Sequence, residues 1–323
     1  MKNFYIGLMS GTSRDSLDAC LVNFDKGFQL IDTATIEFSK DYKSSEDQDF
    51  IGKEITKKSI EIVNFLRKKW PEKNIKAVAF PGQTISHTDE YSIQAGNPEE
   101  INMETSLPIY ADFRNFDIAR GGRGAPLVPE FHKYFFAKEG VSQLIFNIGG
   151  ISNGTHLVGN TISEASDVGP GNCLLDLMAK NLNIGDFDKN GDTAAKGKSN
   201  IRLLNFLLEK LEHLAYPRAD DISFYYEIFE SSKNFQKTIS SNDILCTLVE
   251  LSALKIKDFH VYCNSPDIVY IHGGGIYNAF LMRRIKNLLG VSVETTEELI
   301  DSKFVEAAAF AYLAYKERAH LFK

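Results

Sequence analysis

The sequence predicts an α/β protein built from two similarly organised halves. Short apolar runs typical of buried strands alternate with segments of helical periodicity along the chain. The same plan of strand, glycine turn and strand opens each half, over residues 4–24 and again over residues 144–158. The chain has 323 residues, 43% of them hydrophobic, which is enough for two ordinary domains. We therefore expect a structural duplication, with the break between domains near residues 135–142.

In the first half, several strands accompany one long helix. Apolar runs predict strands over residues 4–9, 16–24, 29–38, 75–80 and 91–94. Aliphatic side chains at helical spacing predict a helix over residues 50–70. The polar segment 40–49 between them is expected to be a loop.

In the second half, strands and helices alternate more regularly. Apolar runs and periodicity predict strands over 144–148, 155–158, 268–271 and 291–294, and helices over 201–214, 241–259, 278–289 and 306–315. Residues 149–154 are expected to form a turn, and residues 215–221 a loop. The acid-rich segment 185–192 lacks the spacing and terminal Glu of an EF-hand, so we expect a solvated loop rather than a calcium site.

Composition narrows the class of protein. The formal net charge is −7 without a basic tail or stripe, which argues against nucleic acid as the main partner but not against a nucleotide. The four cysteines show neither paired nor metal-ligand spacing, as is typical of a reducing cytosol; they are Cys20, Cys173, Cys246 and Cys263. We find no signal peptide, and the apolar stretch 307–315 is too short to span a bilayer. We expect a cytoplasmic protein with no membrane partner.

The most informative stretch runs over residues 166–180. Proline fixes φ and glycine tolerates positive φ, so Gly169-Pro170-Gly171 predicts a sharp reversal. Asn172 is expected to cap the helix that follows. Asp176 lies one turn into that helix, near its positive end, so we expect an ionised carboxylate facing whatever the turn approaches. Such an acid suits a general base beside a phosphate or sugar; the alternative is that it only interacts with the helix dipole.

Two other glycine segments suggest ligand contacts. At the tip of the first hairpin, residues 10–13 and Asp15 supply hydroxyls, a glycine N–H and an acid, which can surround phosphate oxygens and a hydrated Mg²⁺. The same composition is also that of an ordinary turn. Gly273-Gly274-Gly275 follows a strand and precedes a helix, so it offers either backbone for a flat ring or only a tight turn.

A charged cluster lies in the middle of the chain. Asp112, Arg114 and Asp117 precede glycines at 121–124. Arginine forks to carboxylates and aspartate accepts from sugar hydroxyls, so the cluster suits a hydroxyl-rich, partly anionic ligand. A salt-bridged surface loop is the alternative. No nucleophilic triad is present, and the spacing of the histidines is not that of a metal site.

Together these segments resemble the anhydro-N-acetylmuramic acid kinase family. Each motif is common alone, but their ordered conjunction over nearly the whole chain is specific. The matching motifs are Gly7–Ser13 with Asp15 and Asp18, Gly82–Thr84, Asp112–Arg114 with Asp117, Gly124–Pro129, Asn147–Asn153, Gly169–Asn172 with Asp176, Gly273–Gly275 with Asn278, and Glu306-Ala307 with Phe310-Ala311.

The resemblance implies the fold of the sugar kinase, heat-shock chaperone and actin superfamily. This fold has two duplicated actin/hexokinase-like (ribonuclease H-like) α/β domains with mixed sheets and an interdomain ATP cleft. It implies an N-terminal actin-like ATPase domain over 1–138 with the last helix, about 304–323, and a C-terminal one over 139–303. The residues that it assigns to ATP are Gly11, Thr12, Ser13, Arg14, Asp15, Ser16, Leu17, Asp18, Gly149, Gly150, Gly169, Gly171, Asn172, Gly273, Gly274 and Gly275.

The resemblance also implies a reaction. The family cleaves the 1,6-anhydro bridge of anhydro-N-acetylmuramic acid and phosphorylates its 6-oxygen, in recycling of cell-wall peptidoglycan. Asp176 matches the general base, and Asp15 and Asp18 are assigned to Mg²⁺ through water. A homodimer is expected by analogy. The residues assigned to the sugar are Gln83, Asp112, Arg114, Asp117, Asn147 and Glu306.

The chain departs from the family pattern at several positions. Pro81 stands where His is usual, Ser16 where Gly is usual, and Arg14 is atypical. A Pro-Pro-Lys-Ser-Thr-Gly-Arg-Glu segment expected after residue 215 is replaced by residues 216–222. A related levoglucosan kinase uses the same chemistry on a smaller sugar. Two alternatives therefore remain: a kinase of another 1,6-anhydrosugar such as levoglucosan, and a non-catalytic nucleotide-binding relative.

Overall fold

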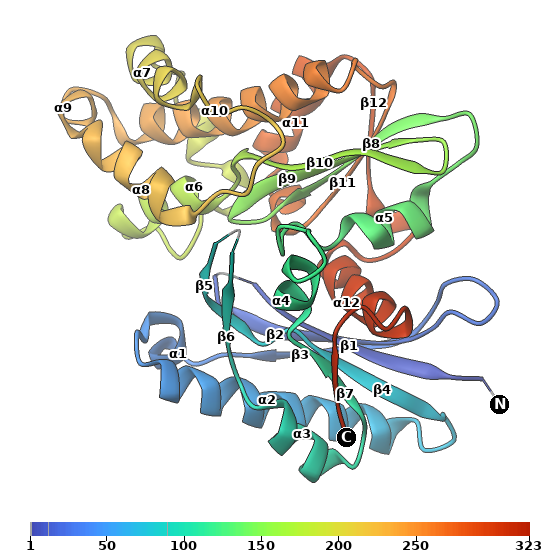
Figure 1. Ribbon diagram of the computed structural model, residues 1–323. Coiled ribbons are helices and arrows are strands. Elements are labelled where there is room, and N and C mark those ends of the chain that lie inside the picture. The colour runs from blue at the N-terminus through green and yellow to red at the C-terminus, as the bar shows by residue number, and fades with distance from the viewer. Residues whose placement is uncertain (1, 12, 89) are drawn as a thin grey trace. The chain divides into compact units, whose positions relative to one another are not determined.

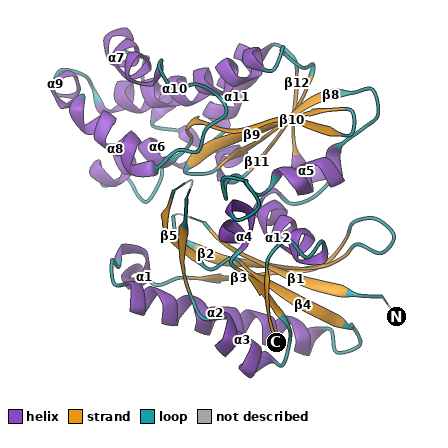
Figure 2. Ribbon diagram, in the orientation of Figure 1, coloured by secondary structure: helices purple, strands orange, loops and turns teal. Residues whose placement is uncertain are grey.

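The computed structural model describes residues 2–11, 13–88 and 90–323. The chain divides into two compact units. We call Met1–Phe136 with Lys303–Lys323 the N-terminal unit, and Ala137–Ser302 the C-terminal unit. Figure 1 labels the elements of each, and Figure 2 distinguishes helices from strands.

The N-terminal unit is built on a six-stranded sheet of order β13-β7-β4-β1-β2-β3. Strands β1, β2 and β3 are antiparallel neighbours, β4 and β7 run parallel to β1, and β13 adds an antiparallel edge. The sheet is therefore mixed. Its strands are β1 (Phe4–Ser10), β2 (Ser16–Asn23), β3 (Gln29–Glu37), β4 (Ile75–Phe80), β7 (Ile109–Ala111) and β13 (His320–Phe322).

Helices cover both faces of this sheet (Figure 1). The long helix α2 (Gln48–Lys69) packs its buried aliphatic side chains into the core on one face. The alanine-rich helix α12 (Val305–Tyr315) lies against the other face and contacts β1. This approach is close enough that a Cβ at Gly7 would lie 1.9 Å from the carbonyl oxygen of Ala307. Glycine on β1 and alanines on α12 are therefore what allow the helix to pack there.

Shorter elements complete the unit. They are α1 (Lys40–Ser44), α3 (Pro98–Thr105), α4 (Phe113–Ile118), α5 (Pro129–Phe136), and the two-stranded ribbon of β5 (Gln83–His87) and β6 (Ser92–Ala95).

The prediction of a loop over 40–49 is wrong, because α1 forms there and α2 already begins at Gln48. The side chain of Ser39 accepts from the backbone of Tyr42, and the ring of Tyr42 stacks on Phe38 at 4.0 Å. Burial of this one aromatic residue stabilises a helical turn in a polar segment.

The C-terminal unit repeats the same sheet. Its order is β10-β9-β8-β11-β12, in which the first three strands are antiparallel neighbours and β11 and β12 run parallel to β8. Order and direction are those of β3-β2-β1-β4-β7, so the predicted duplication is confirmed. The strands are β8 (Ser142–Ile148), β9 (Ile151–Val158), β10 (Thr161–Pro170), β11 (Ile268–His272) and β12 (Ser292–Thr295).

Helices build the core of the C-terminal unit against this sheet. They are α6 (Cys173–Asn181), α7 (Ile201–Leu211), α8 (Ile222–Ser231), α9 (Lys233–Gln236), α10 (Ser241–Tyr262) and α11 (Ala279–Leu289). Helix α10 is central: Phe259 packs edge-on against Phe146 of β8, and a Cβ at Gly154 would lie 2.6 Å from its ring. Helices α6, α7, α10, α11 and α12 agree with the predicted ones, whereas α8 and α9 were not predicted.

Two predicted turns are shorter than expected. Gly169 and Pro170 belong to β10, where they pair with Ser152 and Ile151 of β9. Neither Gly169 nor Gly171 has a positive φ, so the chain turns only at Gly171-Asn172. The turn predicted over 149–154 is likewise confined to its first two residues, since β9 begins at Ile151. In both places pairing with the neighbouring strand extends the strand through glycine and proline.

One further expectation concerns membranes. Within the described ranges, the structure has no helix that is both long and apolar enough to cross a bilayer.

Candidate functional site

The tip of the β1–β2 hairpin is one predicted phosphate contact. A Cβ at Gly11 would find its nearest described neighbour, the Ser13 hydroxyl, at 3.9 Å, so the space beside this glycine is open. The Gly11 carbonyl accepts from the backbone N–H of Arg14, which has a φ of 55°. The guanidinium of Arg14 donates to the carbonyl of Ser45 at 2.7 Å, and this bond holds the turn against another part of the N-terminal unit. Thr12, also assigned to ATP, lies outside the described residues.

Gln83 lies directly behind this turn. Its side chain is 1% exposed. The amide Nε2 donates to the Gly11 carbonyl at 3.2 Å, and Oε1 accepts from the Ser10 hydroxyl at 2.7 Å. The structure therefore places a residue that the resemblance assigns to the sugar in contact with the hairpin turn.

The two acids assigned to Mg²⁺ differ in environment. Asp15 is exposed and pairs with Lys43 at 2.7 Å. Asp18 is largely buried, and burial raises the pKa of its carboxyl, although a hydrogen bond from Thr35 and the charge of Lys303 oppose the rise. In the part of the chain that the structure describes, no group of three or more His, Cys, Asp or Glu is placed to hold a metal ion.

Ser16 and Leu17, which precede Asp18 on β2, have different environments. The Ser16 hydroxyl donates to the Asp18 carboxylate at 3.3 Å. Leu17 is 1% exposed and its side chain belongs to the apolar core, so a contact of Leu17 with a nucleotide would have to be made by its backbone. Because side chains alternate along a strand, only the backbone of Leu17 faces the same surroundings as its neighbours.

The charged cluster of the N-terminal unit holds a loop together. Asp117 accepts from the backbone N–H of Gly124 at 2.9 Å, and Arg114 donates to the Gly124 carbonyl at 2.9 Å. A Cβ at Gly122 would lie 2.0 Å from the Asp117 carboxylate, so a larger residue there would displace this side chain from its bond to Gly124. Arg114 and Asp117 thus both bond the backbone of Gly124.

The other residues assigned to the sugar in this unit lie nearer the surface. Asp112 has a φ of 56° and accepts from Asn115 at 2.6 Å. Its second carboxylate oxygen lies 3.1 Å from Nδ1 of His320. Glu306 lies half-buried in the first turn of α12.

In the C-terminal unit, the β8–β9 turn and the start of α6 interlock. The backbone N–H of Gly171 donates to Gly150 at 2.9 Å, and that of Asn172 donates to Gly149 at 2.8 Å. A Cβ at Gly171 would lie 2.4 Å from the Gly149 carbonyl. Asn172 stands at the N-cap position but does not cap the helix as predicted, because its side chain donates to the Ile148 carbonyl at 3.2 Å. The amide links the start of α6 to the end of β8.

The third glycine segment packs on the same strand end. Gly273 has a φ of 86°, and a Cβ there would lie 2.2 Å from Oδ1 of Asn147. Gly275 is equally crowded, since its Cβ would lie 2.2 Å from Cγ2 of Ile148. At Gly274 the nearest described atom is Nδ2 of Asn172, at 3.9 Å, so that position is open. The segment is a tight turn with one accessible glycine.

Unsatisfied polar atoms lie among these glycines. Among the residues that the structure describes, Oδ1 of Asn147 and Oγ of Ser152 are buried without a hydrogen-bond partner. Buried polar groups are nearly always paired in folded proteins, so such atoms require an additional partner. A ligand or water held at the ends of β8 and β9 would supply one.

Asp176, the predicted general base, lies half-buried in the first turn of α6. Helix α8 packs against α6 and brings Tyr226 near it. Burial raises the pKa of Tyr226 to about 12, and the charges of Cys173 and Asp176 add to the rise. Sequence reasoning missed Tyr226, because α8 was not predicted.

The segment that replaces the expected family motif is anchored by a buried ion pair. Arg218 donates from Nε to the Asp220 carboxylate at 2.9 Å, and their side chains are 10% and 6% exposed. The guanidinium also donates to the carbonyls of Val168 and Leu214 and lies over the ring of Tyr216. These contacts tie the segment to β10, the strand that leads into α6.

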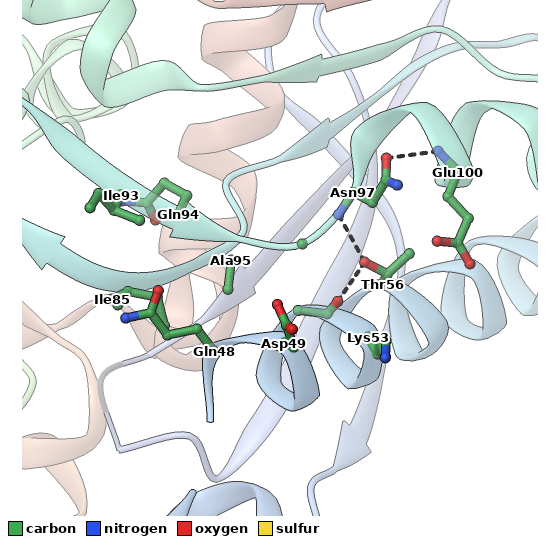
Figure 3. A pocket seen from close by; sticks show the side chains of 12 residues that line it. Gln48, Asp49, Lys53, Thr56, Ile85, Ile93, Gln94, Ala95, Asn97 and Glu100 are labelled. Atoms are coloured by element: carbon green, nitrogen blue, oxygen red, sulfur yellow. Dashed lines mark hydrogen bonds between the residues drawn. The ribbon is translucent and has the colours of Figure 1, made fainter. Parts of the chain in front are cut away.

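A pocket of about 410 Å³ lies elsewhere in the N-terminal unit, between the start of α2 and the β5–β6 ribbon (Figure 3). Within it, Thr56 accepts from the backbone of Asn97 at 2.9 Å and donates to the carbonyl of Gly52. The residues that line it are Gln48, Asp49, Gly52, Lys53, Thr56, Ile85, Ile93, Gln94, Ala95, Gly96, Asn97 and Glu100. None of the predicted site residues is among them.

The repeated sheets, each with a glycine turn between its first two strands, define the chain as an α/β protein of the actin/hexokinase-like class. Comparison with solved structures agrees on the fold. The chain is similar to the activator of 2-hydroxyisocaproyl-CoA dehydratase from Clostridium difficile with bound ADPNP, at a TM-score of 0.52 and 12% identity, covering 98% of this chain and 95% of that one. For component A of (R)-2-hydroxyglutaryl-CoA dehydratase from Acidaminococcus fermentans the TM-score is 0.51, at 12% identity and 98% coverage of both chains.

Comparison with sequence families is more specific. The family model described as anhydro-N-acetylmuramic acid kinase matches residues 3–321. A relative of that name from Shewanella oneidensis is 36% identical, over 98% of this chain and 92% of its own. Another, from Gamma-proteobacterium EBAC31A08, is 37% identical over the same shares. The chain belongs to the anhydro-N-acetylmuramic acid kinase family and is a kinase.

Proposed function

We propose that the protein is an ATP-dependent kinase of 1,6-anhydro-N-acetylmuramic acid that opens the anhydro ring with water. The product is N-acetylmuramic acid 6-phosphate, and the role is recycling of peptidoglycan sugar. Membership of the family over residues 3–321 is the observation that carries this proposal. Each unit then corresponds to one actin-like ATPase domain.

The proposed reaction couples hydrolysis to phosphoryl transfer. The Asp176 carboxylate accepts a proton from water, the water oxygen bonds to the anomeric carbon, and the bond from that carbon to the 6-oxygen breaks. The 6-oxygen then bonds to the γ-phosphorus of ATP, whose bond to the leaving oxygen of ADP breaks. ATP, water and the anhydrosugar thus become ADP, the sugar 6-phosphate and a proton. A positioned base of this kind contributes about 10²–10⁴ to the rate.

Asp176 is suited to this role by its position. It lies in the first turn of α6, where the helix dipole favours the ionised carboxylate. It is half-buried rather than enclosed. The neighbouring phenol of Tyr226 keeps its proton at neutral pH, since its pKa is raised to about 12. Asp176 is therefore the member of this pair that is able to accept a proton.

Glycine backbone supports the nucleotide assignments. Gly11 and Gly274 leave open space, and the buried Oγ of Ser152 needs a partner. Backbone N–H groups in glycine turns bind phosphate oxygens without requiring side-chain charge. We keep the predicted nucleotide residues, with Leu17 limited to its backbone, and regard Gly169 as a packing position because its Cβ would lie 2.8 Å from Lys255.

Mg²⁺ would be held near Asp18 and Asp15 through water. The Asp18 carboxylate suits this role because hydrogen bonds from Thr35 and Ser16 already orient it. Its charge is balanced by the ammonium group of Lys303. When bound, the ion would neutralise charge on the β- and γ-phosphates. Asp18 would orient its water, while Lys303 would compete for the same oxygen.

The sugar would be bound by Asp112, Asn147 and Glu306, and the loop braced by Arg114 and Asp117 would place its backbone near the sugar. Carboxylates and amides accept from and donate to sugar hydroxyls. A cytoplasmic homodimer is part of the same proposal.

A second candidate function is a kinase of another 1,6-anhydrosugar, such as levoglucosan. The anchored segment that carries Arg218 and Asp220 favours it, because this segment stands where the family motif is expected and leads into the helix of Tyr226. A segment of different sequence that leads into the helix of Tyr226 would favour a different sugar.

The test is product analysis after incubation of the protein with ATP, Mg²⁺ and each anhydrosugar. The proposal expects N-acetylmuramic acid 6-phosphate, with one oxygen from labelled water at the anomeric position. Turnover of levoglucosan alone would favour the second candidate. Nucleotide binding without turnover of any anhydrosugar would indicate a non-catalytic relative and contradict both.

A further inference from the structure

Gln83 joins three separate parts of the N-terminal unit. It begins β5, immediately after Gly82, whose φ of 72° and close approach to the Ala95 carbonyl restrict that position to glycine. From there its side chain reaches the end of β1 at Ser10, the turn at Gly11 and the helix α1 at Tyr42.

The hydrogen bonds define the orientation of the amide. The hydroxyls of Ser10 and Tyr42, 2.7 Å and 3.4 Å from Oε1, can donate or accept, so they fit either orientation of the amide and donate to Oε1 here. The Gly11 carbonyl can only accept, so the atom 3.2 Å from it is Nε2. A flipped amide would place its oxygen against the Gly11 carbonyl oxygen, where no donor is available between them. The side chain therefore fits in one orientation.

The side chains around this amide are buried. Gln83 is 1% exposed, Ser10 is 6% exposed, and Tyr42 is fully buried and stacked on Phe38. The Gly11 carbonyl is held by two donors, Nε2 of Gln83 and the backbone N–H of Arg14. Removing the side-chain donor would leave a buried network with one partner missing, which loosens the turn.

We propose that Gln83 is a positioning residue for the nucleotide, acting through the Gly11 turn, rather than a contact of the sugar. This inference rests on the proposed function, because it takes the hairpin turn as the phosphate contact. Because Gln83 is 1% exposed and its amide already bonds Ser10, Gly11 and Tyr42, little of this side chain is left for a sugar hydroxyl to reach. A nucleotide benefits from Gln83 without touching it, since a turn held in one conformation loses less entropy on binding.

The test is the variant Gln83→Glu, which keeps the size of the side chain and the acceptor for Ser10 and Tyr42. It removes only the donor to Gly11 and places a carboxylate against that carbonyl. Titration calorimetry at pH 8 with AMPPNP and Mg²⁺, without sugar, should show nucleotide affinity weakened about tenfold or more. Affinity for 1,6-anhydro-N-acetylmuramic acid alone should change less than twofold.

A pH series separates positioning from general damage to the fold. Protonation of the introduced carboxyl restores a donor to Gly11, and burial raises its pKa. The ratio of wild-type to Gln83→Glu nucleotide affinity should therefore fall towards one as the pH is lowered to about 5.5. A ratio that stays constant with pH would overturn the proposal.

Gln94→Glu is the matched control. Gln94 of β6 also bonds two side chains, accepting from Thr84 at 2.9 Å and donating to Ser92 at 2.7 Å, but it does not contact the turn. This variant should leave nucleotide affinity unchanged. Ser10→Ala should weaken nucleotide affinity in the same direction as Gln83→Glu, but less.

The outcomes distinguish this inference from the proposed function. Weakened sugar affinity with normal nucleotide affinity in Gln83→Glu would overturn the positioning role. If the parent protein binds AMPPNP but phosphorylates no anhydrosugar, the proposed function fails while the result for Gln83 stands. If the parent protein binds no nucleotide, both are wrong.

Discussion

Arg218→Met tests whether the segment in place of the family motif is held by its buried ion pair. Arg218 and Asp220 are 10% and 6% exposed, and Asp220 also accepts from the hydroxyl of Tyr225. Removing one partner leaves a buried carboxylate without its counter-charge, which typically costs about 3–5 kcal/mol. The guanidinium bonds to the carbonyls of Val168 and Leu214 are lost as well. We therefore expect the free energy of unfolding to fall by about 3–5 kcal/mol.

Urea unfolding followed by far-UV circular dichroism measures this loss. The only tryptophan of the chain, Trp70, lies in the N-terminal unit, so its fluorescence reports on that unit. If the units unfold independently, the dichroism midpoint shifts and the Trp70 midpoint does not. A single cooperative transition would shift both together.

Two variants serve as controls for Arg218→Met. Lys233→Met removes an exposed pair with Glu230, whose side chains are 64% and 50% exposed, and should cost less than about 1 kcal/mol. Adding Asp220→Asn to Arg218→Met removes the unpaired charge and should recover part of the loss. A loss below about 1 kcal/mol in Arg218→Met would refute the reasoning, because the pair would then be replaceable by water.

Three further predictions follow from single sites. Asp176→Asn should reduce turnover by about 10²–10⁴ with unchanged nucleotide affinity, and normal turnover would remove Asp176 from the mechanism. Burial lowers the pKa of His272 from 6.5 to about 3, so the unfolded chain binds more protons between these values. Stability should be complete above about pH 6.5 and fall by roughly 1.4 kcal/mol per unit as the pH decreases, with a flatter profile in His272→Gln. Gly273→Ala should destabilise more than Gly290→Ala, since both have positive φ but only Gly273 would place a Cβ against Asn147, at 2.2 Å; equal unfolding midpoints would contradict this.

Local patterns predicted most of the fold. Apolar runs identified β1, β2, β3 and β8, and helical spacing identified α2 and α10, because burial on one face leaves a periodic trace in the sequence. Helix α1 left no such trace. It depends on the stacking of Tyr42 on Phe38 and on a cap from Ser39. Likewise Gly169-Pro170 reads as a turn, and only pairing with β9 makes it strand.

The candidate site likewise has features that the sequence predicted and features that only the structure revealed. Motif spacing identified the glycine turns, and the structure shows that Gly171 packs against Gly149 and that Gly273 packs against Asn147. Spacing did not reveal that Gln83 faces the hairpin, nor that Arg218 and Asp220 form a buried pair. The first depends on a partner 72 residues away in the chain, and the burial of the second on contacts such as that of Arg218 with Val168, 50 residues away.

By itself, the sequence determined the alternation of strands and helices, the duplication and the order of the glycine motifs. The tertiary structure alone decided which polar side chains are used inside the protein and which remain for a ligand. The physical reason is that periodicity and turn chemistry act over a few residues, whereas a buried amide or carboxylate takes the hydrogen-bond partner that packing brings to it.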